Sequence, residues 1–203
     1  YGTGAANAPS AGRPLRVGFS SDLGFAPVDP EVRAGFEAAL AALADAGLAA
    51  TPATPPPLSP LPFIVPMLAC EVYAAFADVV DDPESGLSPQ TRAVAGANGT
   101  VGGPEYVRLA TERLAFEAAW RAWFADWDVL LTPTTQLPAF EVGRYGPDAI
   151  DDQPVDPEAD GGWYPTSFVA NVLGAPAISV PSGATAAGLP LAIQAMGAPG
   201  GDL

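Results

Sequence analysis

A long uninterrupted helix that leads directly into an apolar strand constrains the fold of this chain more than any other feature. From Pro104 to Asp126 there is no interior proline or glycine, and Phe116, Trp120 and Phe124 recur every four residues. This spacing puts the three aromatic side chains on one face of a helix, a pattern far more typical of core or interface packing than of a cofactor site. The strand DVLLTP follows at residues 128–133. A helix that runs into a buried strand predicts an α/β layer structure.

A second unit near the start of the chain also pairs a strand with a helix. The run LRVGF at residues 15–19 predicts a buried strand. Asp29 can accept hydrogen bonds from the free amides of a first helical turn, Pro30 suits the first helical position, and Glu31 favours the positive end of the helix dipole. The apolar stripe of the predicted helix comprises Val32, Phe36, Leu40 and Leu43.

The intervening segments show where regular structure should stop. Residues 1–13 are small and polar and are predicted to be flexible. Residues 48–66 are predicted to be extended, because the seven prolines from Pro52 to Pro66 disfavour both a helix and a central strand. A helix is expected to resume around residues 67–80.

The C-terminal third combines an acidic stretch with two strands. Residues 141–165 are predicted to form an acidic surface loop, since a metal site would need carboxylates that converge on one point. Residues 177–181 and 190–195 are predicted to be two further core strands, joined by a turn at residues 183–188.

Composition excludes several classes of function. The formal net charge of −15 would repel both phosphate backbones and anionic lipids, which argues against nucleic-acid and membrane partners. With no His in the chain, a Ser-His-Asp triad and a His-based zinc site are excluded. The single cysteine, Cys70, excludes an intrachain disulfide framework. No cofactor or metal is expected, and a cytoplasmic location is predicted because the first residues do not have the pattern of a signal peptide.

Three motifs follow one another in the second half of the chain. The first is DVLLTPT at residues 128–134 after a long helix, and the second is the Asn-x-x-Gly-x-Pro-Ala and Pro-x-Gly run at residues 171–183. The third is Gly-Leu-Pro followed by a Gln on the next strand, at residues 188–194. In this order the three motifs resemble those of the amidase signature family. The structural motif residues are Asn171, Gly174, Pro176, Pro181, Gly183 and Gln194. The N-terminal stretch from residue 15 to residue 32 is also similar to the unit that follows the catalytic half in this family.

The resemblance implies a fold, and it implies which part of the family's domain this chain represents. It implies the C-terminal part of the amidase signature fold, in which a mixed β-sheet core is covered by helices, so that residues 1–203 are a partial amidase domain. The family cleaves amide bonds with a Ser, a second Ser on a cis peptide bond, and a Lys. This chain has no Lys and no Gly-Gly-Ser-Ser-Gly-Gly type of loop. No catalytic residue is therefore assigned, and the chain alone is expected to be inactive.

Substrate contacts are implied by the resemblance rather than by residue spacing. In relatives that make amidated tRNA, an Arg on a helix holds the substrate carboxylate, and Arg92 is the matching position. The Asp that holds the ammonium is replaced by Tyr164 here, which favours an aryl or alkyl amide over a free amino-acid amide. Thr166 and Ser167 are the other expected pocket residues. We expect Asn171 and Gln194 to tie a loop to a strand by side-chain-to-backbone hydrogen bonds, and Gly174 and Gly183 to relieve backbone crowding.

The leading hypothesis is the C-terminal part of an amidase that converts a small-molecule amide and water into a carboxylic acid and ammonia or an amine. Such a protein could form a homodimer when complete. A second hypothesis is a noncatalytic binding or scaffolding module derived from the same fold. A third, an independent solute-binding α/β domain, depends only on the first strand and helix.

Overall fold

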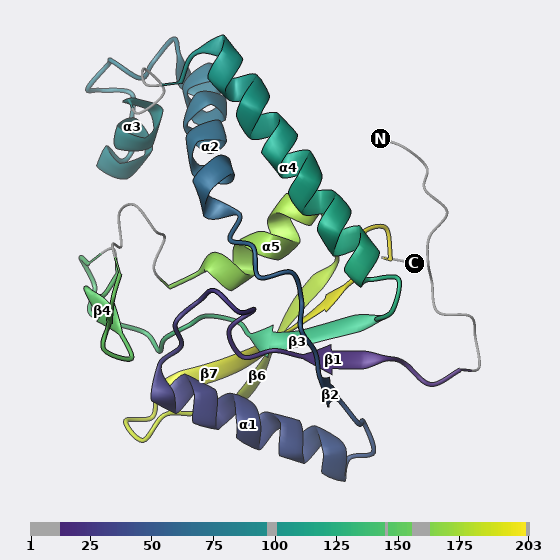
Figure 1. Cartoon of the computed structure of the whole chain (residues 1–203). Helices are drawn as coiled ribbons and strands as arrows, with labels where there is room; N and C mark the ends of the chain where they lie inside the picture. Colours follow the sequence, from purple (N-terminus) through teal and green to yellow (C-terminus); the bar gives the residue numbers. More distant parts are fainter. Residues whose placement is uncertain (1–12, 97–100, 145, 156–162, 202–203) are drawn as a thin grey trace. The chain divides into compact units, whose positions relative to one another are not determined.

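A computed structural model describes residues 13–96, 101–144, 146–155 and 163–201 of the protein. The chain divides into two compact units (Figure 1). The first comprises the described residues up to Ser59 and from Glu117 onward, and the second is Pro60–Phe116. Most of the segment predicted to be flexible, residues 1–12, lies outside the described residues.

A five-stranded mixed sheet forms the centre of the first unit. Its order is β2-β1-β3-β7-β6. The strands are β1 (Val17–Phe19), β2 (Thr51–Pro52), β3 (Val129–Pro133), β6 (Ala177–Ala184) and β7 (Pro190–Gly197). β1 runs parallel to β2 and β3, whereas β7 is antiparallel to both of its neighbours, β3 and β6. The predicted mixed sheet is confirmed, and the helix between β1 and β2 completes a βαβ unit.

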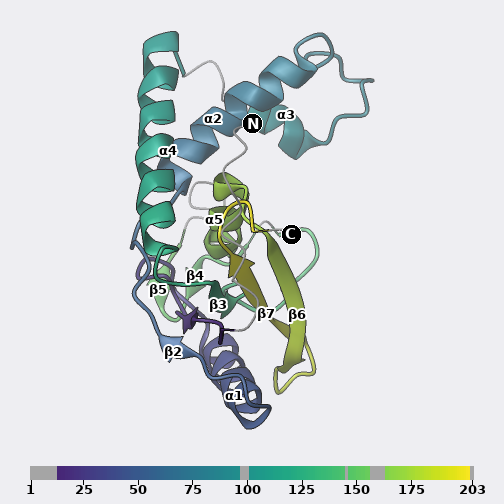
Figure 2. The ribbon, with the colours of Figure 1, turned by 90° about the vertical axis from the view of Figure 1, so that its right-hand side faces the viewer.

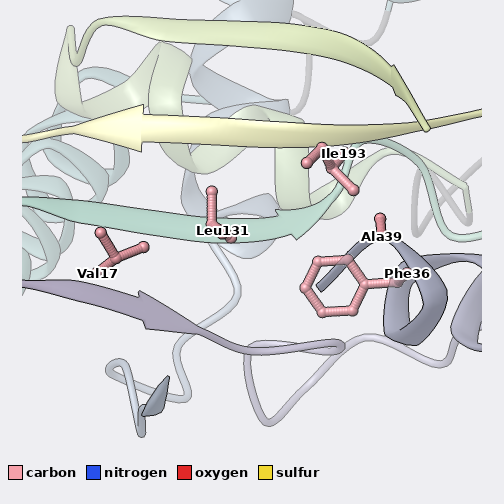
Figure 3. Close-up of a cluster of buried hydrophobic side chains, with 5 residues drawn as sticks. All are labelled: Val17, Phe36, Ala39, Leu131 and Ile193. Atoms are coloured by element: carbon pink, nitrogen blue, oxygen red, sulfur yellow. The ribbon is translucent and has the colours of Figure 1, made fainter. Parts of the chain in front are cut away.

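That helix, α1 (Pro30–Asp45), starts as its sequence predicts. The Asp29 carboxylate accepts hydrogen bonds from the amides of Glu31 (2.8 Å) and Val32 (3.4 Å). The apolar side of α1 packs on one face of the sheet, with Phe36 and Ala39 against Val17, Leu131 and Ile193 (Figure 3). Leu40 and Leu43 lie partly buried around this cluster.

The other face of the sheet is covered by α5 (Pro165–Leu173) and by the end of α4 (Gly103–Trp123). Figures 1 and 2 show α1 and α5 on opposite sides of the sheet. Trp120 and Phe124 are buried, so the predicted packing role of the aromatic row is confirmed for these two residues in this unit. The Trp123 indole donates to the Thr54 carbonyl at 3.1 Å.

Asp128 ties the beginning of β3 to the chain that precedes β1. Its carboxylate accepts two hydrogen bonds of 2.6 Å from Arg13, one of 3.1 Å from the Arg16 guanidinium and one of 2.8 Å from the Arg16 amide. The Asp128 amide in turn donates to the Arg16 carbonyl at 2.9 Å. These contacts set the register between two strands that lie far apart in the sequence.

β6 differs from the prediction of a core strand. The sheet order places it at the edge, and among the described residues its ladder partner is β7. All eight of its residues are exposed or only partly buried, including Ile178 at 61% and Val180 at 41% exposure. Local sequence predicted a strand correctly, but burial depends on neighbouring strands that the sequence pattern does not reveal.

The proline-rich segment is also more structured than predicted. Thr51 and Pro52 form the edge strand β2, and α2 (Leu61–Phe76) begins within the segment that was expected to be extended. Pro62 lies in the first turn, where an amide proton is not needed, so it is compatible with a helix. Pro66 lies inside α2 and removes one backbone hydrogen bond.

The second unit consists of α2, α3 (Pro89–Gly96) and the first part of α4. Phe63 and Phe116 pack edge to face with ring centroids 5.4 Å apart. The Ser88 hydroxyl accepts a hydrogen bond from the Thr91 amide at 3.0 Å, which caps the start of α3.

The described part of the acidic stretch contains a short hairpin rather than only a loop. Strands β4 (Ala149–Ile150) and β5 (Gln153–Pro154) pair antiparallel. Asp151 and Asp152 between them have φ angles of 51° and 57°, as a tight hairpin turn requires. Among the described residues no group of three or more acidic, Cys or His side chains could hold a metal ion.

Candidate functional site

Polar side chains gather on the α5 side of the sheet, near the carboxyl end of β3. Because Leu131 faces α1, alternation turns Thr132 toward the opposite face. Buried Gln194 of β7 lies opposite Thr132 in the ladder, and its side-chain amide donates to the Thr132 hydroxyl at 3.4 Å. The hydroxyl oxygens of Thr134 and Ser179, which follow on this side, lie 2.9 Å apart.

The first turn of α5 lies against the loop that leaves β3. The Ser167 hydroxyl donates to the Thr134 carbonyl at 2.8 Å. The side-chain amide of Gln136 donates to the Thr166 hydroxyl at 2.6 Å, and the Gln136 main-chain amide donates to the Trp163 carbonyl at 3.1 Å. Pro165 occupies the first helical position, where its missing amide proton costs nothing.

Three of the four predicted substrate-binding residues therefore lie together on this turn. Thr166 is fully buried with its hydroxyl bonded to Gln136, whereas Ser167 and Tyr164 are partly exposed. Burial raises the pKa of the Tyr164 hydroxyl. Like any phenol at neutral pH, this group can donate a hydrogen bond.

Aromatic rings surround the same turn. The Trp163 ring packs edge to face against Phe140 (centroids 5.8 Å apart) and against Tyr164 (4.8 Å). Tyr164 also contacts Phe168, with centroids 5.0 Å apart. These four half-buried rings give the start of α5 an apolar surface beside its hydroxyl groups.

Arg92, the fourth predicted residue, belongs to the second unit. Its guanidinium donates to the carbonyl oxygens of Val80 and Asp82 (3.0 Å for Asp82) and to the Ser85 hydroxyl at 3.1 Å. The observed contacts of Arg92 thus hold the turn between α2 and α3.

The motif residues have local structural reasons for their identity. Gly174 ends α5 in the left-handed conformation with φ 57°, and Gly183 has φ 143° at the irregularity where the β6 register shifts. Apart from the adjoining residues of the chain, no described atom would lie within 4 Å of a Cβ atom at either glycine. Any crowding that these glycines relieve is therefore local, because at positive φ a Cβ atom approaches its own backbone.

The remaining motif residues lie around the β6–β7 pair. Gln194 bonds to a side chain of β3 rather than to backbone, which corrects the expected partner type. Pro176 packs against Gly197, where an added Cβ atom would lie 3.2 Å from the Pro176 ring. Pro181 lies in β6. Asn171 is exposed on α5.

The adjacent serines after β1 serve the turn in which they lie. The Ser20 hydroxyl accepts from the Leu23 amide at 3.0 Å, and the Ser21 hydroxyl accepts from Arg33 at 3.2 Å. Leu23 is buried with φ 53°, an uncommon conformation for a bulky residue.

Sequence reasoning missed Gln136 and gave Asp128 no role of its own. A glutamine after a Thr-Pro strand end carries no periodic signal, and only its burial and its contacts with α5 reveal its importance. Taken together, the site offers hydroxyl and amide groups that can bind and orient a ligand. The chain contains neither His nor Lys, and the groups named here are hydroxyls, amides and aromatic rings, none of which is a strong general base at neutral pH.

No helix within the described ranges is long and apolar enough to span a bilayer.

Comparison with known proteins places this geometry in a family. The family model described as Amidase matches residues 3–203. The acylamidase of Rhodococcus erythropolis is 29% identical over 187 residues, which cover 89% of this chain and 38% of that protein.

Solved structures show the same fold. A crystal structure of an amidase superposes with a TM-score of 0.78 at 23% identity, covering 94% of this chain and 43% of that one. A bacterial aryl acylamidase of the amidase signature family gives a TM-score of 0.74 at 20% identity, covering 94% of this chain and 41% of that one. The chain thus spans less than half the length of these similar proteins. Because the family model matches nearly every residue, the chain belongs to the amidase signature family.

Proposed function

We propose that this chain is the C-terminal part of an amidase that hydrolyses a carbon–nitrogen amide bond to a carboxylic acid and ammonia or an amine. The observation that carries this proposal is that nearly the whole chain matches the amidase family model, while it covers only 38% of the acylamidase and 43% of the amidase of known structure. In this proposal the chain contributes sheet core and one wall of the substrate pocket.

The chemistry of amide hydrolysis supports this division. A nucleophile must attack the carbonyl carbon, donors must stabilise the oxyanion, and the leaving nitrogen must receive a proton. This chain has no Lys or His, and the hydroxyls of Ser20 and Ser21 both accept local hydrogen bonds. We therefore propose that these 203 residues alone do not turn over amides.

The exposed edge strand supports a role as part of a larger sheet. β6 carries no charged residue, and its β-branched residues Ile178 and Val180 are 61% and 41% exposed. Soluble proteins normally protect edge strands with charges, prolines or covering elements, and Pro181 alone gives little protection to eight residues.

The substrate side of the proposal concerns the first turn of α5. Tyr164, Thr166 and Ser167 are proposed to form the pocket wall. Arg92, in the second unit, is proposed separately as a substrate contact. The aromatic rings around Tyr164 and the lack of a carboxylate at this position favour an aryl or alkyl amide over a free amino-acid amide. We also propose a cytoplasmic enzyme that can form homodimers, which cell fractionation and sedimentation would test.

The decisive experiment compares the complete gene product that contains this chain with residues 1–203 alone. Both are assayed by ammonia or amine release from a panel of anilides, alkyl amides and amino-acid amides. We expect hydrolysis by the complete protein, strongest on aryl or alkyl amides, and none by the 203 residues. A complete protein inert on the whole panel would contradict the proposal. Cooperative unfolding of the isolated chain would then favour the noncatalytic module.

A further inference from the structure

The loop that leaves β3 connects three elements through one buried residue. Gln136 is fully buried, and its main-chain oxygen accepts from the amide of Asp29, the N-cap of α1, at 2.8 Å. Its main-chain amide donates to the Trp163 carbonyl at 3.1 Å, and its side-chain nitrogen donates to the Thr166 hydroxyl at 2.6 Å. Gln136 thus links the end of β3 and the start of α1 to the first turn of α5.

The second polar atom of the Gln136 side chain is unsatisfied. Among the described residues no hydrogen-bond partner reaches Oε1, although the atom is buried. Exchanging the oxygen and nitrogen positions would not help, because the side chain still has a single polar contact. Since an unpaired buried acceptor destabilises a fold, an apolar residue of similar length, such as Met, would suit this position better if packing were its only task.

The bond to Thr166 explains why an amide is present. Thr166 lies between Tyr164 and Ser167, and the Tyr164 carbonyl accepts a hydrogen bond from the Ser167 amide at 3.0 Å, which closes the turn around Thr166. Gln136 fixes this turn at two points, the Trp163 carbonyl and the Thr166 hydroxyl. We infer that Gln136 is a positioning residue that sets the place of the α5 first turn for substrate binding, without touching the substrate itself. This inference rests on the proposed amidase function.

The test uses the complete gene product with Gln136→Met, Thr166→Val and the double variant. Hydrogen–deuterium exchange measures the peptide covering residues 163–173, with the α1 peptide 36–45 as internal reference. We expect each single variant to speed exchange in the α5 peptide at least threefold and to leave the α1 peptide unchanged. The double variant should exchange no faster than the faster of the two single variants, because each change removes the same hydrogen bond between Gln136 and Thr166.

Kinetics provide a second readout that general destabilisation would not mimic. Gln136→Met should raise KM for an anilide about fivefold while kcat stays within twofold, since a displaced binding turn weakens binding before chemistry. The matched control is Thr185→Val, which removes another buried hydroxyl that accepts from the Leu189 amide at 3.1 Å in the β6–β7 turn. This control should change neither the α5 exchange nor KM.

Unchanged exchange at residues 163–173 in Gln136→Met would overturn the inference, and so would exchange effects that multiply in the double variant. If wild type hydrolyses no amide, the proposed function fails, and the exchange experiment then decides only whether Gln136 holds the α5 first turn in place. If exchange responds while KM does not, Gln136 holds the turn only structurally and the inference is wrong.

Discussion

Replacement of Asp128 by Asn should weaken the fold by a predictable amount. The carboxylate is 7% exposed and is bound by Arg13 and Arg16, whose side chains are 36% and 44% exposed. The hydrogen bonds from Arg13, and then those from Arg16, hold the pKa of Asp128 well below its usual range, although burial acts in the opposite direction. Asn has nearly the same shape and can still accept from the Arg16 amide, so the change removes mainly the charge.

The expected magnitude follows from these contacts. Hydrogen bonds to a charged group contribute about 1.5–3 kcal/mol in favourable surroundings. Because both guanidinium groups are more than one third exposed, solvent screening places the expected loss toward the lower end of this range. Asp128→Asn should therefore lower the free energy of unfolding by about 2 kcal/mol at pH 7. Asp128→Ala should cost about 3 kcal/mol, since it also leaves the Arg16 amide without its acceptor.

The pH dependence has a defined sign. The pKa of Asp128 is lower in the folded than in the unfolded protein, where it is about 3.9. The stabilisation is therefore fully present above the unfolded pKa and disappears as the pH falls from about 4 toward the folded pKa. The difference between wild type and Asp128→Asn should be largest near neutral pH and should shrink below about pH 4.

Urea unfolding followed by far-ultraviolet circular dichroism at pH 7, 5 and 3.5 measures this effect. Asp126→Asn is the matched control, because Asp126 is exposed two residues away and the substitution changes the net charge equally. A loss at pH 7 of less than about 0.5 kcal/mol, the usual limit for surface substitutions, would refute the reasoning. So would an equal loss in the Asp126 control.

Three further predictions concern single positions. Gly18→Ala should destabilise by about 1–3 kcal/mol in urea unfolding, because its Cβ would lie 2.8 Å from the Ala53 Cβ and 2.9 Å from the Trp127 ring. Gly35→Ala should lower the free energy of unfolding clearly less than Gly18→Ala, because its Cβ would meet only the flexible end of the Leu191 side chain. Equal losses of stability in the two variants would contradict this account. Gly174→Ala should cost about 1–2 kcal/mol because φ is 57° at this helix end, and a neutral effect would show that the end adopts another conformation. Ile178→Lys should reduce self-association of the isolated 203 residues, measured by light scattering, because it places a charge on the exposed edge strand β6. Val107→Lys, at a residue of similar exposure on α4, should not reduce it. If only Val107→Lys reduced self-association, β6 would not be the edge through which the chains associate.

Much of the fold could be predicted from local patterns. The start of α1 at Asp29-Pro30-Glu31 and its stripe through Val32 and Phe36 follow from capping chemistry and helical spacing. The strand at β3 and the positions of β6 and β7 were also predicted. The helical residues 61–66 were not, because proline content argued against a helix although prolines early in a helix are tolerated.

Less of the candidate site than of the fold could be predicted from the sequence. The family resemblance predicted Tyr164, Thr166 and Ser167 as substrate contacts. The structure adds that all three lie at the first turn of α5. Gln136 remained hidden because a residue outside regular structure has no periodicity to mark it as buried. The actual contacts of Arg92 with Val80, Asp82 and Ser85 depend on a turn that no motif predicts.

The sequence by itself determined the family, the α/β class, most helix and strand positions, and the absence of Lys and His, because these depend on residue types and local spacing. Only the tertiary structure decided that β6 lies at the edge, that Gln136 holds the first turn of α5, and that Asp128 binds two arginines. The physical reason is distance along the chain. The Arg16 amide and the Asp128 carboxylate are separated by 112 positions, and a contact of that kind forms only when the sheet brings both segments together.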